Sequence, residues 1–173
     1  MEYSIAAIRC GRWSVGPITR RSRFTAMAEA RTATQRITDT LQKLVQDREA
    51  WVASTDAHRP WLVPLWFLWH DGRLVFAIAA SSATARDLSQ VAGVRIALGH
   101  PRDVVIIEGD AALAPSSAMT IAELAAYQAK HDSDPRAWAD TIFRVRPRRI
   151  QAWREENENS GRTLMRGGQW LAS

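Results

Sequence analysis

Apolar residues between positions 31 and 48 recur at the spacing of one helix face. In a helical conformation one face would carry four apolar residues, namely Ile37, Leu41, Leu44 and Val45. Polar residues fill the positions between them. Because an α-helix repeats every ~3.6 residues, this spacing gathers the apolar side chains on a single stripe. The pattern predicts an amphipathic helix over residues 31–48.

The pattern then changes to extended runs rich in β-branched and aromatic residues, which favour strands. Three such runs cover residues 50–55, 60–69 and 73–79. Short polar segments separate them, and the second segment contains Asp71-Gly72, a pair that supplies the positive φ of a tight hairpin turn. Strands joined by such short turns pair antiparallel, so we expect an antiparallel meander here.

The second half of the chain continues with strands and peripheral helices. Further strands are expected at 94–99, 103–113, 140–145 and 149–154, helices at 84–91 and 117–131, and a closing tail at 161–171. About six strands joined by short turns favour a closed or partly closed barrel over an open parallel sheet, because parallel strands need long crossovers. The expected fold class is mainly β, a β-barrel with peripheral helices.

Pro64 lies inside the second expected strand and restricts how that strand can pair. Proline has no N–H to donate to a sheet, so a central strand tolerates it poorly. Two interpretations stay open: the chain faces a ligand at this point, or Pro64 lies at a sheet edge or bulge. Glu108 and Asp110 form a second ambiguous pattern, for which alternation on a solvent-facing strand is favoured over a paired-carboxylate site.

The composition is that of an ordinary globular protein. The chain has 173 residues, of which 46% are hydrophobic and 24% charged, and no apolar run approaches the ~18 residues of a membrane-spanning helix. Its single cysteine, Cys10, cannot form an internal disulfide, which fits a cytoplasmic location, and no Cys/His spacing indicates a metal site. The four histidines are expected to be solvated; they are His58, His70, His100 and His131.

The net charge of +5 is concentrated at the start of the chain. Residues 1–27 contain five arginines and one glutamate, so the rest of the chain is nearly neutral and a nucleic-acid-binding face is disfavoured. We expect residues 1–28 to be a disordered extension and residues 29–173 to form one domain. The extension could be a targeting sequence, a basic arm or, as we favour, a stretch upstream of a true start at Met27.

The junction near residue 84 is the strongest candidate for chemistry. Ser82, Thr84 and Arg86 surround the start of an expected short helix, where unpaired N–H groups and a guanidinium can bind a phosphate. The competing interpretation is that the hydroxyls simply cap the helix. The sequence contains no glycine-rich dinucleotide loop, Walker sequence or recognisable nucleophilic triad, which points toward a bound cofactor as the source of reactivity.

A family resemblance rests on the order and spacing of several segments over residues 31–171. They are Arg59-Pro60 to Val63-Pro64-Leu65-Trp66-Phe67, then Asp71-Gly72-Arg73-Leu74, Ser82-Ala83-Thr84-Ala85-Arg86-Asp87-Leu88, Val94-Arg95-Ile96-Ala97-Leu98, Arg146-Pro147 through Trp153, and Gly161 to Arg166. Together they resemble the pyridoxamine 5′-phosphate oxidase-like, FMN-binding split-barrel superfamily. Within it, the chain is similar to the branch that includes deazaflavin (coenzyme F-420)-dependent reductases. The resemblance implies a six-stranded antiparallel split barrel.

The resemblance also implies a cofactor site. Ser82, Thr84 and Arg86 would hold the cofactor phosphate. The ring would lie along Pro64, Leu65, Trp66, Ile78 and Ala79, and Trp153, Arg162 and Arg166 would approach from the second subunit of a homodimer. These residues are carried over by similarity alone.

The sequence departs from the family pattern in two positions. Thr84 stands where many relatives have Lys, and Asp87 stands where they have Asn, so a carboxylate beside the phosphate would repel it unless it pointed away. FMN and the deazaflavin both stay open. The long acidic tail of the deazaflavin needs basic residues further out, for which Arg59, Arg148 and Arg149 are candidates; the alternative is that these three form a solvated face.

The resemblance implies an oxidoreductase that transfers a hydride between bound flavin or deazaflavin and a small organic substrate, with no catalytic side chain identified. A non-catalytic carrier of a flavin, heme or similar planar ligand is the alternative. Neither a membrane nor a nucleic-acid partner is expected.

Overall fold

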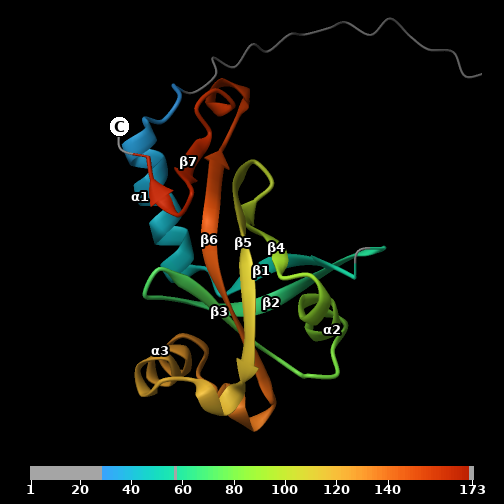
Figure 1. Ribbon diagram of the computed structural model, residues 1–173. Helices are drawn as coiled ribbons and strands as arrows, with labels where there is room; N and C mark the ends of the chain where they lie inside the picture. Colours follow the sequence, from blue (N-terminus) through green and yellow to red (C-terminus); the bar gives the residue numbers. More distant parts are fainter. Residues whose placement is uncertain (1–28, 57, 172–173) are drawn as a thin grey trace, which may run out of the picture.

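The structure is a computed structural model that describes residues 29–56 and 58–171, so the expected extension at residues 1–28 lies outside it. Its strands are β1 (Glu49–Thr55), β2 (Pro60–His70), β3 (Arg73–Ile78), β4 (Gly93–His100), β5 (Asp103–Pro115), β6 (Thr141–Trp153), β7 (Thr163–Arg166) and β8 (Gln169–Trp170). Its α-helices are α1 (Ala33–Gln46), α2 (Ala83–Gln90) and α3 (Ile121–His131). Figure 1 shows α1 along one side of the strands and α3 at the opposite end from β7.

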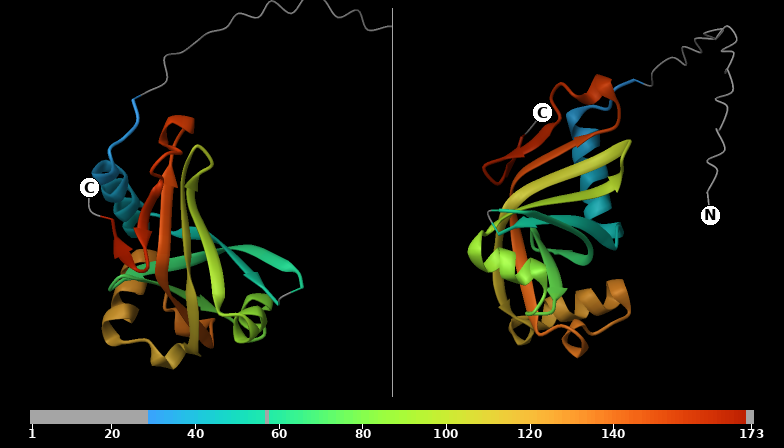
Figure 2. Two further views of the ribbon diagram at one scale, coloured as in Figure 1. Left: turned by 45° about the horizontal axis from the view of Figure 1, so that its top comes forward. Right: turned by 90° about the vertical axis from the view of Figure 1, so that its right-hand side faces the viewer.

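The strands form a closed six-stranded antiparallel barrel. The order is β3-β2-β1-β4-β5-β6, and pairing of β3 with β6 closes the ring. The hairpin between β2 and β3 turns at Asp71 and Gly72, whose φ values are 48° and 68°. β7 and β8 extend the sheet beyond β6 (Figure 2). The expected mainly β barrel with peripheral helices is confirmed.

The last barrel strand differs from the sequence expectation. Residues 141–153 form one continuous strand, whereas separate strands at 140–145 and 149–154 were expected around Pro147. The register of β5 and β6 shifts between Glu108 and Gly109, which leaves Arg148 as an extra residue beside Pro147. β3 pairs with β6 before Pro147 and β7 pairs after it, so the missing N–H lies in the gap between two partners.

Pro64 has a similar explanation. Residues 60–66 of β2 pair with β1, and only residues 67–70 pair with β3. Pro64 therefore lies in a half of the strand that has one strand partner among the described residues. The edge interpretation accounts for this proline without a ligand.

The core fills the barrel with side chains from every barrel strand. Phe76 and Phe143 stack with ring centroids 4.6 Å apart, and Phe67 packs against Phe76 at 6.0 Å. Leu44 of α1 and Leu88 of α2 join this cluster from outside. Each of these helices thus covers the barrel through a buried leucine, although Leu41 and Val45 of the expected apolar stripe on α1 are exposed.

Each α-helix begins at a side-chain cap. Thr32 and Gln35 form a capping box on α1, and Thr120 and Glu123 form another on α3. The second box explains why α3 begins at Ile121 rather than at 117, where the helix was expected; residues 116–118 form a short 3₁₀ turn instead. No helix among the described residues is long and apolar enough to cross a membrane.

His131, at the end of α3, is buried against β2. Its Nε2 lies 3.0 Å from the carbonyl oxygen of Phe67, and its ring stacks on Trp66. The expectation of four solvated histidines is therefore wrong for His131. The error arose because the polar residues around it in the sequence do not show that α3 turns this face onto the barrel.

Candidate functional site

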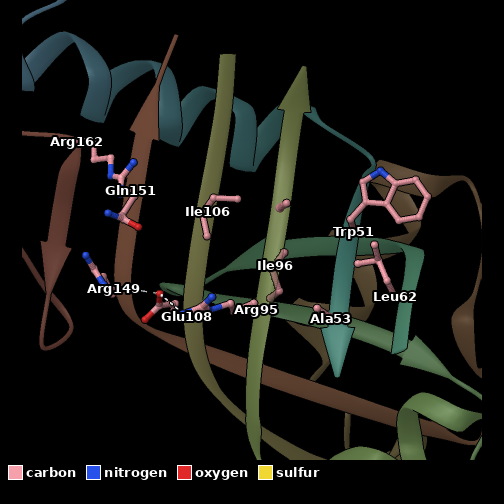
Figure 3. A pocket seen from close by; sticks show the side chains of 11 residues that line it. Trp51, Ala53, Leu62, Arg95, Ile96, Ile106, Glu108, Arg149, Gln151 and Arg162 are labelled. Carbon is pink, nitrogen blue, oxygen red and sulfur yellow. Dashed lines mark ion pairs between the residues drawn. The ribbon is translucent and has the colours of Figure 1, made fainter. Parts of the chain in front are cut away.

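A groove of about 450 Å³ crosses the outer face of the barrel. Its floor is apolar and comes mainly from Trp51 and Ala53 of β1, Leu62 of β2, Ala97 of β4 and Ile106 of β5. Figure 3 shows these strands side by side, with the side chains that line the groove drawn as sticks. An exposed surface this rich in large apolar side chains is characteristic of a ligand or partner site.

Strand register determines which side chains reach the groove. Ala53 pairs with Arg95, Arg95 with Glu108, and Glu108 with Arg149, so the four lie in one row across the sheet. The Glu108 carboxylate lies 3.2 Å from Arg95 and 3.8 Å from Arg149 (Figure 3). Glu108, the one carboxylate among the described lining residues, is thus already paired with cations.

Asp110 does not share the groove with Glu108 as a catalytic pair. It is exposed and pairs with Arg148 at 3.0 Å, and the buried Gly109 separates the two carboxylates along the strand. The solvent-facing interpretation of Glu108 and Asp110 is confirmed.

At the β6 end of the groove, Gln151 lies between two arginines. When its amide oxygen faces them, that oxygen accepts hydrogen bonds from Nη2 of Arg149 and Nε of Arg162, both at 3.1 Å. In the opposite orientation the amide NH₂ group would face the N–H groups of the two arginines, which are also donors. The orientation with the oxygen toward the arginines is therefore favoured. The guanidinium of Arg162 also lies over the ring of Trp153, 5.1 Å from its centroid.

Two further hollows continue from the groove, each sharing lining residues with the one before it. The second shares Ala53, Arg95 and Glu108 with the first, and the third shares Pro60 with the second. Along the three hollows the lining includes six arginines, namely Arg59, Arg86, Arg95, Arg148, Arg149 and Arg162. The carboxylates of the lining are three, Asp56, Asp87 and Glu108, so the surface attracts anions.

The turn before α2 lies at the far end of these hollows. The Ser82 hydroxyl accepts a hydrogen bond from the Ala85 N–H at 3.2 Å, which is a capping role, and Thr84 is buried. Arg86 is exposed and donates to the Ser81 carbonyl oxygen at 3.1 Å. Of the three residues expected around a phosphate, Arg86 alone lines a hollow.

Asp87 also lines that hollow, and its carboxylate accepts a hydrogen bond from the buried Ser54 hydroxyl at 2.7 Å. A hydroxyl donor stabilises the carboxylate without neutralising it. Arg86 therefore has a carboxylate as its neighbour in this hollow, which makes the turn a poorer anion site than a lone arginine would.

The family sequence profile described as pyridoxamine 5′-phosphate oxidase matches residues 37–154 of the chain, which span all six barrel strands. The chain belongs to the pyridoxamine 5′-phosphate oxidase family. No curated protein sequence matches the chain significantly.

Solved structures agree with the family fold. A conserved hypothetical protein of Mycobacterium tuberculosis gives a TM-score of 0.58 at 17% identity, covering 75% of this chain and 89% of its own. General stress protein 26 of Bacillus anthracis gives 0.53 at 16% identity, covering 69% and 95%. An F420 reductase gives 0.51 at 17% identity, covering 63% and 94%. At these identities the likeness shows a shared fold.

The residues that the family resemblance implies along the cofactor ring lie in different environments. Pro64 is exposed and pairs with Trp51 of the groove floor, while Leu65 packs against the core. Trp66 lies outside the groove lining, stacked on His131. At the end of β3, Ile78 is buried and Ala79 is exposed.

The remaining implied residues gather at the end where Gln151 lies. Trp153 contacts Arg162, Arg162 lines the groove, and Arg166 pairs across the sheet with Arg149. The structure thus brings these basic residues together, at the opposite end of the hollows from the turn before α2. Arg59, Arg148 and Arg149, the candidates for the acidic tail, all line hollows.

Sequence reasoning missed the groove floor. Trp51, Ala53, Arg95 and Ala97 alternate along their strands with the buried residues between them. That period-2 alternation was available in the sequence, but it identifies an outer face without showing which outer faces adjoin. The strand order of the barrel supplies that information.

The groove combines apolar surface with cationic side chains. Trp51 and Leu62 offer apolar surface, and the arginines offer charge-assisted hydrogen bonds to oxyanions. Because Glu108 is paired with Arg95 and Arg149, the groove offers no free carboxylate from a described residue for proton transfer. Its lining residues are therefore suited to binding rather than to proton transfer.

Proposed function

We propose that the chain is a flavin- or deazaflavin-dependent oxidoreductase that transfers a hydride between the bound cofactor and a small organic substrate. The observation that supports this most is the groove, in which an apolar floor containing Trp51 is flanked by Arg95, Arg149 and Arg162 in a member of the pyridoxamine 5′-phosphate oxidase family. Bound there, the cofactor would supply the redox chemistry that the side chains lack.

The arginine pattern favours the deazaflavin over FMN. A phosphate at the turn before α2 would meet the charged Asp87 and would have Arg86 as its cation, because Thr84 is buried. A ligand with a long acidic tail would instead find arginines along the whole series of hollows, including Arg59 and Arg148. We therefore rank the deazaflavin first and FMN second.

We propose the cofactor-binding residues that the family resemblance implies, and we assign each a role that agrees with its contacts in the structure. Ser82 and Thr84 shape the turn, and Arg86 lines the neighbouring hollow together with Arg59, where both would meet an acidic tail. Pro64, Leu65, Trp66, Ile78 and Ala79 would shape the ring site. The family resemblance implies that Trp153, Arg162 and Arg166 act from the partner subunit; because Arg162 lines the groove of its own chain, we propose that it binds the ligand there and that the groove faces the partner. We propose that residues 29–173 form the cofactor-binding domain.

We propose that the protein works as a homodimer with the cofactor at the subunit interface. Trp51 is 51% exposed and Leu62 is 58% exposed on the groove face, which is costly for large apolar side chains in a monomer. Covering this face with a second copy would bury them and would enclose the groove. A closed site excludes water from a reactive reduced cofactor.

A carrier role is the second candidate, and the pairing of Glu108 favours it. A groove without a free acid or base can hold a planar ligand, such as a flavin or heme, without promoting a reaction. Mixing the protein with reduced cofactor and candidate acceptors separates the two functions, because a carrier leaves the cofactor absorbance unchanged while an oxidoreductase reoxidises it.

The direct test of the proposal is native mass spectrometry of the purified, unheated protein. We expect a dimer that carries one flavin or deazaflavin per subunit, identified by the mass of the released ligand. A monomer that neither retains nor binds either cofactor would contradict the proposal.

A further inference from the structure

The side chain of Gln151 lies in the groove between two guanidinium groups, and its chemistry is unusual for that position. Carboxylates are the common partners of arginine, and Glu108 is such a partner for Arg95 and Arg149. Gln151 instead offers an amide oxygen, which accepts from Arg149 Nη2 and Arg162 Nε at 3.1 Å each. A neutral acceptor orients both cations without cancelling either charge.

The surroundings hold the two arginines without neutralising Arg162. Its guanidinium lies over the Trp153 ring, and it forms no ion pair with a carboxylate among residues 29–56 and 58–171. Arg149 shares Glu108 with Arg95, at the longer of the two distances. Each guanidinium has five N–H donors, so several remain free after the bond to Gln151.

Two oriented guanidinium groups with free donors form a receptor for an oxyanion. Arginine matches the spacing of carboxylate and phosphate oxygens, and two arginines fixed by one acceptor lose little entropy when the anion binds. We propose that Arg149 and Arg162 bind an oxyanion of the ligand and that Gln151 is the positioning residue that holds them for it. The proposal rests on the proposed function only for the identity of the molecule that carries the oxyanion.

The discriminating variant is Gln151→Glu, which keeps the shape and changes the charge. A carboxylate would bind both guanidinium groups more strongly than the amide does. It would also neutralise positive charge that would otherwise attract the ligand. We therefore expect anion binding to weaken while thermal stability stays equal or rises. A residue with a merely structural role would not move these two quantities in opposite directions.

The measurement is isothermal titration of the full-length protein with inorganic pyrophosphate and, separately, with citrate. We expect both to bind the wild type, and Gln151→Glu to raise Kd about tenfold, as the loss of one charge-assisted contact predicts. If the two arginines prefer phosphate, the Gln151→Glu substitution reduces the affinity for pyrophosphate more than the affinity for citrate. If they prefer carboxylate, it reduces the affinity for citrate more. Gln151→Met, which removes the acceptor without adding charge, should weaken binding less than Gln151→Glu does.

Gln128→Glu is the matched control, because Gln128 is exposed on α3 and outside all three hollows. It adds the same charge and should leave Kd unchanged. Absence of anion binding by the wild type, an unchanged Kd in Gln151→Glu, or an equal loss in Gln128→Glu would overturn the proposal. Since the probes contain no flavin, the receptor can be confirmed even if the redox function fails, and it can fail while a flavin binds.

Discussion

The imidazole of His131 lies parallel to the indole of Trp66, with ring centroids 5.0 Å apart and planes within 6°. This stack, together with the contact between His131 Nε2 and the Phe67 carbonyl oxygen at 3.0 Å, fastens the end of α3 to β2. Since the carbonyl can only accept, Nε2 carries the proton in the neutral ring. Nδ1 is then a buried atom without a partner among the described residues.

The buried Nδ1 makes stability depend on pH. Burial lowers the pKa of His131 from its ordinary value of 6.5, assisted by the positive charges of Lys130 and Arg48. The unfolded chain therefore binds the proton more readily, and stability falls as the pH drops from 6.5 toward the lower pKa of the folded state.

Replacing His131 by Phe should remove this pH dependence. His131→Phe keeps a ring on Trp66 but loses the hydrogen bond to Phe67, so at neutral pH it should cost about 1 kcal/mol. Urea unfolding at about pH 7.5 and about pH 5.5 measures the effect, because histidine titrates in this interval. A variant as pH-sensitive as the wild type would contradict the role of His131.

The carboxylate of Glu158 anchors the segment before α1 and is only 3% exposed. It accepts hydrogen bonds from the Arg31 side chain and from the backbone N–H groups of Arg31 and Arg154. The hydrogen bonds from Arg31 lower the pKa of Glu158 from 4.5 to about 2. Its stabilising effect is therefore complete above pH 4.5 and is lost as the pH falls toward 2.

Glu158→Gln should destabilise the protein by about 3 kcal/mol at neutral pH, because it leaves the largely buried Arg31 without its full counter-charge. Thermal and urea unfolding measure this loss. Glu155→Gln is the control, since Glu155 pairs with Arg102 at the surface and its loss should have little effect. Equal effects of the two substitutions would show that burial does not matter here.

Gly109 is needed for the close approach of β5 to β6 at the bulge. A Cβ atom there would lie 2.5 Å from the Arg146 carbonyl oxygen and 2.7 Å from Val145 Cγ1. Gly109→Ala should therefore cost about 2 kcal/mol through overpacking. Gly93→Ala, in the neighbouring strand, meets nothing within 4 Å and should be neutral or slightly stabilising. Comparable unfolding midpoints for the two variants would contradict this explanation of the bulge.

The exposed apolar face of the groove should carry the dimer. Leu62→Glu places a charge in the centre of that face, so we expect a monomer by light scattering of the eluted protein and weaker cofactor binding. Ile121→Glu makes the same change on α3, where Ile121 is 90% exposed, and should leave the mass unchanged. If the Leu62→Glu protein remains dimeric, the dimer interface lies on another face.

The sequence was a good guide where local signals dominate. The period of α1, the Asp71-Gly72 turn and the β-branched and aromatic residues of β1 each report on short-range structure, and each element lies close to where it was expected. The strands expected at 140–145 and 149–154 are one strand, because β6 continues through Pro147 while its neighbour changes from β3 to β7, a change that the local sequence does not show.

The candidate site was harder to predict because its residues come from different strands and become neighbours only through the order of those strands in the barrel. Ala53, Arg95 and Arg149 come from three strands, and only the barrel register places them in one row. The turn at Ser82 had two interpretations, and the structure shows the cap. His131 appeared polar and loop-like, yet it packs under an indole that the family resemblance had placed beside the cofactor ring.

The central claim is that the arginine-flanked groove binds a flat, acidic redox cofactor. Fluorescence titration of the purified protein with the deazaflavin coenzyme and with FMN, alongside Arg162→Ala, tests it most directly. We predict saturable binding of the deazaflavin, weaker binding of FMN, and an affinity reduced about tenfold or more in Arg162→Ala, in line with the loss of a charge-assisted contact. Binding of neither cofactor, or full affinity in the variant, would contradict it.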